Sequence, residues 1–137
     1  MTIPFGLQPA AASRAKTRTG HLLSGLAIAF LLFDCVIKFI NPPFVAQASV
    51  QIGWSPALAP DLGMILLACT VLYAVPRTSV LGAILLTGYL GGAVATHLRV
   101  GDPLLSHVLF PVYLGVILWT GLWLREDRLR VLLPGRS

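Results

Sequence analysis

Charged residues are scarce in this chain of 137 residues, because Asp, Glu, Lys and Arg together make up only 11% of it. Soluble domains average about 25% charged residues, whereas 56% of this chain is hydrophobic. A soluble domain of this length would have too few charges to cover its surface, so we expect the lipid bilayer to be the solvent. Intrinsic disorder of the whole chain is excluded, because it requires low hydrophobicity and high net charge.

Cysteines and catalytic motifs are also lacking. Cys35 and Cys69 lie inside apolar runs and form no C-x-x-C pair, so we interpret them as packing residues and expect neither a disulfide framework nor a zinc site. The sequence contains no Walker loop, dinucleotide-binding fingerprint, H-E-x-x-H motif or nucleophile elbow. The net charge of +5 does not indicate a nucleic-acid partner, because the basic residues lie at the edges of apolar runs rather than on one soluble face.

Long uncharged stretches predict membrane-spanning helices. About 20 mostly apolar residues are needed to cross the hydrocarbon core of a bilayer. Residues 78–98 and 104–124 reach this length directly. A further span is predicted over residues 56–75, with Ser55 as its N-cap and Pro56 in its first turn.

The first span is predicted over residues 20–40, although it contains two charges. Asp34 and Lys38 lie four residues apart, so on a helix they share a face, in the order that favours pairing of an acid with a base. Pairing lowers the cost of placing both charges in the membrane. Residues 1–19 are predicted to form a disordered tail. The fold class is therefore predicted to be an all-α integral membrane protein with a bundle of four transmembrane helices.

The connection between the first and second spans is predicted to hold a short interfacial helix. Residues 39–60 are uncharged but contain several prolines and polar residues, which argue against a span. Apolar residues nevertheless recur there at helical spacing, with Asn41 as a cap and Gly53 as a stop signal. Trp54 would then lie at the level of the lipid headgroups.

The basic residues predict the orientation of the bundle. Eight of the ten Lys and Arg residues fall on one side, which is cytoplasmic by the positive-inside rule, so both termini and the C-terminal tail, residues 126–137, are expected inside. Tyr73 is expected among the aromatic residues at the inner interface. The eight residues are Arg14, Lys16, Arg18, Arg77, Arg125, Arg128, Arg130 and Arg136.

In this orientation, ionisable residues gather in the outer half of the bundle. An ionisable side chain inside a membrane is a functional-site hypothesis by default. Asp61, Arg99 and Asp102 lie near helix ends, where anchoring at the interface is the simpler interpretation. The alternative for the remaining charges is that they form salt bridges that hold the bundle together. The candidate polar site consists of Asp34, Lys38, His97, Arg99 and His107.

The third span is rich in small residues, which let helix backbones approach closely in lipid. This helix is therefore predicted to pack inside the bundle or at a dimer interface. Gly20 and Ser24 offer a weaker version of the same pattern on the first span. The residues of the stronger pattern are Gly88, Gly91, Gly92 and Ala95.

Several segments resemble the DoxX-like family of small bacterial membrane proteins. They are residues 33–38 followed by Pro42 and Pro43, then residues 73–78, 82–99 and 107–111, and the resemblance extends over about residues 20–133. It implies a four-helix bundle in the bacterial inner membrane. The family takes its name from a subunit of a thiosulfate:quinone oxidoreductase. Cysteine pairs of some redox-active relatives are missing in this chain, which argues against a thiol relay.

Two functions remain open from the sequence. By analogy with the family, the chain is expected to be an accessory subunit in quinone-linked electron transfer, with a quinone at the candidate polar site. The alternative is a non-catalytic assembly or packing partner whose buried charges are structural. The expected partners are the lipid bilayer and either a second copy of the chain or a redox partner subunit.

Overall fold

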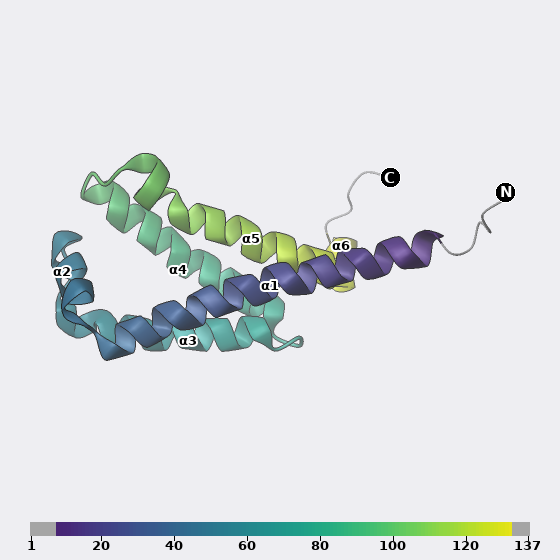
Figure 1. Ribbon diagram of the computed structural model, residues 1–137, viewed down its shortest axis with the longest axis horizontal. Coiled ribbons are helices and arrows are strands. Elements are labelled where there is room, and N and C mark those ends of the chain that lie inside the picture. The colour runs from purple at the N-terminus through teal and green to yellow at the C-terminus, as the bar shows by residue number, and fades with distance from the viewer. Residues whose placement is uncertain (1–7, 133–137) are drawn as a thin grey trace.

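The computed structural model describes residues 8–132, and this part of the chain is built from helices and their connections. A short 3₁₀ turn, Pro56–Leu58, precedes α3, and a π-helical turn, Leu104–Val108, precedes α5. Within the described residues, four helical units are long and apolar enough to cross a membrane: Ala11–Ile40, Pro56–Ala74, Ser79–Arg99 and Leu104–Arg125. The α-helices are α1 (Gln8–Ile40), α2 (Pro43–Gln51), α3 (Ala59–Ala74), α4 (Ser79–Arg99), α5 (Phe110–Arg125) and α6 (Asp127–Leu132) (Figure 1).

The first helix is longer than predicted at its N-terminal side. α1 begins at Gln8, so the prediction of a disordered tail is wrong for residues 8–19, and residues 1–7 lie outside the described part of the chain. The segment is rich in Ala, Arg and Lys, which are strong helix formers. Pro9 falls in the first turn, where its missing N–H interrupts no hydrogen bond.

The four long helices, α1, α3, α4 and α5, form an antiparallel bundle. Each packs against the one that follows it in the chain, and α5 also packs against α1, so the four helices form a closed ring. The start of α1 lies at one end of the bundle, together with α6 and the α3–α4 loop (Figure 1). We call this the terminal end, and we call the opposite end, which carries α2 and the turn at Leu104–Val108, the loop end. The α4–α5 pair draws apart from the α1–α3 pair toward the loop end (Figure 1). Accordingly, the buried residues of α4 all lie between Ser79 and Leu90.

Tyr73 joins three helices in the terminal half of the core. Its side chain is fully buried, its hydroxyl donates to the Leu118 carbonyl at 2.7 Å, and the Ser24 hydroxyl lies 3.0 Å away. Arg125 donates to the Tyr73 carbonyl at 3.0 Å, and its guanidinium carbon lies 5.0 Å from the centroid of the Tyr73 ring. Tyr73 is therefore a core residue and not, as predicted, part of an aromatic belt facing lipid headgroups.

Helices α1 and α5 cross closely at small residues. A Cβ atom on Gly20 would lie 2.8 Å from the backbone nitrogen of Arg125 and 2.9 Å from the Gly121 carbonyl oxygen. A Cβ atom on Gly121 would lie 2.7 Å from the Ser24 hydroxyl oxygen. The weaker small-residue pattern, Gly20 with Ser24, thus lets α1 and α5 approach closely.

The stronger pattern on α4 does not pack inside the bundle. A Cβ atom on Gly88, Gly91 or Gly92 would meet no neighbouring atom within 4 Å, and Ala95 is exposed as well. These four residues lie on a face of α4 turned away from its neighbours, so they do not pack inside the bundle. α4 itself does pack inside the bundle, against α3 and α5, through other residues that include Gly82. The alternative, a dimer interface, stays a prediction.

Candidate functional site

Asp34 and Lys38 form an ion pair on α1. The Lys38 Nζ atom lies 2.5 Å from Asp34 Oδ2, and the two side chains are only 21% and 33% exposed, respectively. The backbone of α3 packs against α1 next to this pair, since a Cβ atom on Gly63 would lie 3.0 Å from the Lys38 Cβ and 3.4 Å from the Cys35 carbonyl oxygen. The pair is therefore half-buried and internally neutralised, which is how charges are tolerated in a membrane helix.

The end of α4 brings His97 and Asp102 together through its backbone. Gly101 adopts a left-handed conformation with φ of 76°, its N–H donates to the Leu98 carbonyl, and the Asp102 N–H donates to the His97 carbonyl at 3.1 Å. These two bonds define a Schellman motif, in which a glycine reverses the chain just after a helix. The reversal places the residue after the glycine beside the last turn of the helix.

The side chains of His97 and Asp102 complete this arrangement. His97 Nδ1 lies 2.6 Å from Asp102 Oδ2, and the side chains are 25% and 29% exposed. A carboxylate that binds one ring nitrogen fixes the orientation of the imidazole and leaves Nε2 as the nitrogen that meets a ligand. The exposed His107 ring lies nearby, with centroids 6.0 Å apart, and its Nδ1 is 2.7 Å from the Ser106 hydroxyl oxygen.

Arg99 binds the end of α2. Its guanidinium donates to the Ile52 carbonyl at 2.7 Å, which is a carbonyl at the C-terminal end of the helix, where a positive charge is favourable. α2 itself ends in a second Schellman motif, with Gly53 at φ of 80° and the Trp54 N–H donating to the Ser49 carbonyl at 2.8 Å. Arg99 therefore joins α4 to the α2 connection.

The candidate polar site is divided into separate groups. The pair on α1, Asp34 with Lys38, has its own partner, and Arg99 is bound to α2. His97 and His107 do lie together, but with Asp102, whose position near a helix end predicts an interface anchor rather than a site residue. The signal for Asp102 was a glycine followed by an acid just after a helix that ends in histidine and arginine.

Within residues 8–132, no three His, Cys, Asp or Glu side chains lie close enough together to hold a metal ion. Cys35 and Cys69 are free and buried, in agreement with their interpretation as packing residues. The side chains that lie together at the loop end, His97, Asp102 and His107, offer hydrogen bonding and proton exchange by imidazole and carboxylate groups.

Comparison with known proteins identifies a family but no individual relative. No curated protein and no solved structure matches the chain significantly. A sequence model described as the DoxX-like family matches residues 22–121, a segment that includes His97, Asp102 and His107 and most of the four candidate spans. The resemblance noted in the sequence is confirmed, and the chain belongs to the DoxX-like family.

Proposed function

We propose that the chain is an accessory subunit in quinone-linked electron transfer, in a bacterial inner membrane and with both termini in the cytoplasm. Membership of the DoxX-like family and four candidate spans support a multi-pass membrane protein. The orientation is supported by the concentration of basic residues at the terminal end.

The observation that carries the proposal is the hydrogen bond between His97 Nδ1 and Asp102 Oδ2. The headgroup of a quinone accepts hydrogen bonds at its carbonyl oxygens, and that of a quinol releases protons from its hydroxyls. Unprotonated Nε2 of His97 would accept a hydrogen bond from a quinol hydroxyl and receive its proton, and the protonated Nε2–H would donate to a quinone carbonyl oxygen. Asp102 would orient the ring and balance its positive charge. His107 is close enough to contact the same headgroup or to pass a proton on.

The surroundings of the pair suit a lipid-soluble ligand. Leu98, Leu104 and Leu105 flank His97 and His107 along the chain, and their side chains are 61%, 57% and 71% exposed. These leucines provide an apolar surface for an isoprenoid tail beside the polar headgroup site. A bound quinone would supply the redox-active ring, whereas the chain supplies position and proton exchange.

The test measures quinone binding to the full chain in lipid nanodiscs. A photoreactive short-chain quinone should label residues near His97 and His107, as located by mass spectrometry. We expect His97→Ala and Asp102→Asn to weaken binding about tenfold, which corresponds to loss of one hydrogen bond in an apolar site. His21→Ala is the matched control, because His21 lies at the terminal end and binds its own helix through the Thr17 carbonyl at 2.8 Å.

Two results would contradict the proposal. Labelling spread over all four spans would mean that the quinone partitions into the bilayer without a site. Equal loss of binding in His21→Ala and His97→Ala would mean that histidine at the loop end has no special part in recognition.

A second function is favoured by the closed ion pair between Asp34 and Lys38. A charge pair that satisfies itself holds a bundle together without needing a ligand, which suits a non-catalytic assembly or packing partner. We propose that the partner of such an assembly is a second copy of the chain or a redox subunit, received on the exposed stripe of α4. The stripe consists of Gly88, Gly91, Gly92 and Ala95.

We also propose that α2 lies in the membrane interface. None of its residues is buried against the bundle, and Phe44 and Val50 are both 63% exposed. Trp54 follows the helix and is 38% exposed, which suits a side chain at headgroup level.

A further inference from the structure

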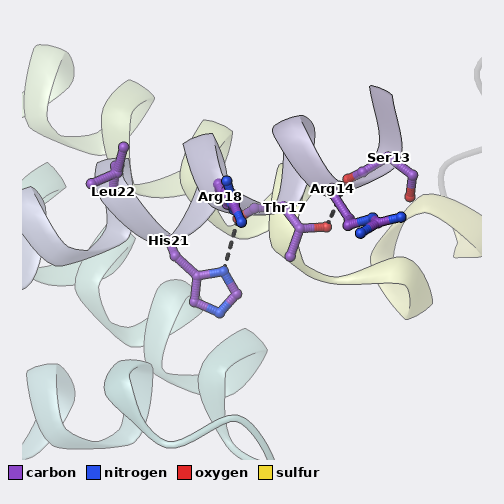
Figure 2. Close-up of a pocket in the computed structure, with 6 residues that line it drawn as sticks. All are labelled: Ser13, Arg14, Thr17, Arg18, His21 and Leu22. Atoms are coloured by element: carbon purple, nitrogen blue, oxygen red, sulfur yellow. Dashed lines mark hydrogen bonds between the residues drawn. The ribbon is translucent and has the colours of Figure 1, made fainter. Parts of the chain in front are cut away.

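One face of α1 is basic where the helix leaves the bundle at the terminal end. This face borders a shallow open hollow of about 740 Å³, and all the residues that line it come from α1 (Figure 2). They recur every three to four positions, so they share one side of the helix. The lining residues are Ser13, Arg14, Thr17, Arg18, His21 and Leu22.

The positive charge on this face is not neutralised within the described chain. The ion pairs formed by residues 8–132 involve other basic side chains, namely Lys38, His97 and Arg130. His21 is oriented by a hydrogen bond from Nδ1 to the Thr17 carbonyl, as Figure 2 shows. Arg14 and Arg18 therefore present two guanidinium groups, one helical turn apart, to whatever occupies the hollow.

The same face becomes apolar further along the helix. Leu22 and Leu26 are 74% and 62% exposed, and between them a Cβ atom on Gly25 would meet nothing within 4 Å. α1 has 33 residues, a length of about 50 Å, and the hydrocarbon core is about 30 Å thick. If the segment from Leu22 to Ile40 spans the core, the arginines lie at the level of the headgroups.

We propose that this face of α1 binds an anionic phospholipid, with the phosphate on Arg14 and Arg18 and an acyl chain along Leu22, Gly25 and Leu26. Guanidinium groups bind phosphate oxygens in pairs, with charge-assisted hydrogen bonds. Inorganic phosphate shares the headgroup chemistry, but only a lipid also uses the apolar strip below it. The inference is independent of quinone binding, because the two sites lie at opposite ends of the bundle.

The experiment measures lipid retained by the full chain. Native mass spectrometry in detergent, with phosphatidylglycerol or phosphatidylcholine added, should show bound phosphatidylglycerol and little phosphatidylcholine. Arg14→Gln and Arg18→Gln should each weaken phosphatidylglycerol binding about tenfold. Both side chains are exposed, so circular dichroism should show unchanged helix content.

Lys16→Gln is the matched control, because it removes the same charge from the same helix but not from the lining of the hollow. It should retain phosphatidylglycerol better than either arginine variant. An equal loss in all three variants would overturn the proposal in favour of general attraction to basic residues. Displacement of the lipid by inorganic phosphate alone, or equal retention of phosphatidylcholine, would overturn it as well.

Discussion

Asp34 is the most deeply placed acid of the predicted spans, and its ion pair with Lys38 determines the effect of replacing it. Replacement by Asn leaves Lys38 without its counter-ion in a half-buried position. We expect Asp34→Asn to lower the free energy of unfolding by about 1–3 kcal/mol, between the values for exposed and buried pairs. Thermal unfolding in detergent, followed by circular dichroism, measures this change.

The double variant Asp34→Asn with Lys38→Met separates structure from ligand binding. If the pair is structural, removing both charges restores much of the lost stability, because no charge is left unpaired. Stability that falls further in the double variant would contradict a purely structural pair. Quinone binding should be unchanged in both variants, since His97 and Asp102 belong to a separate group.

The two pairs of an acidic with a basic side chain differ in how far the sequence could predict them. Asp34 and Lys38 follow from helix geometry alone, because residues four apart meet on any α-helix. His97 and Asp102 are five apart and meet only because Gly101 reverses the chain in a left-handed conformation. The burial of Tyr73 depends on how three helices pack, which local sequence does not specify.

Among the helices, close approach distinguishes glycines that look alike in sequence. In Gly121→Ala the added methyl group would lie 2.7 Å from the Ser24 hydroxyl oxygen, so α1 and α5 must move apart. We expect a loss of about 1–3 kcal/mol in the free energy of unfolding, as for overpacked cores. Thermal unfolding of the purified chain in detergent gives the measurement.

Gly88→Ala is the matched control for Gly121→Ala. Its methyl group would meet no atom within 4 Å, so the substitution should leave stability unchanged or raise it by up to about 1 kcal/mol through the better helix propensity of alanine. Equal destabilisation by the two substitutions would show that the α1–α5 crossing is not the place where small residues matter.

The sequence predicts the ends of a helix well where the length of an apolar stretch sets them, and poorly where a helix extends beyond the apolar stretch. The last three spans, predicted over 56–75, 78–98 and 104–124, differ by one residue or less at each end from the candidate spans in the structure. The start of α1 at Gln8 was missed because residues 8–19 are too polar to span a membrane. The sequence predicts Asn41 as the cap of the short helix, but Asn41 directly follows the last residue of α1, with φ of 49°, and Pro42 takes the N-cap position of α2.

Across the whole molecule, the distribution of charge and the arrangement of the helices favour the same orientation in the membrane. The connections and tails at the terminal end carry a net charge of +6 in the sequence, whereas the remaining charges sum to −1. The structure places the start of α1 and the last described helix, α6, at that same end (Figure 1). An even number of spans with this asymmetry favours termini on the cytoplasmic side.

Two exposed serines, Ser13 near the start of α1 and Ser55 in the connection before α3, test the orientation. Cys35 and Cys69 are buried, so they should give little background with thiol reagents. In intact cells, a membrane-impermeant maleimide should label Ser55→Cys but not Ser13→Cys, and after lysis it should label both. The reverse pattern in intact cells would put the termini outside and move the His97–Asp102 pair to the cytoplasmic half. Labelling of both variants in intact cells would contradict the assignment of the α1 segment from Leu22 to Ile40 as a span.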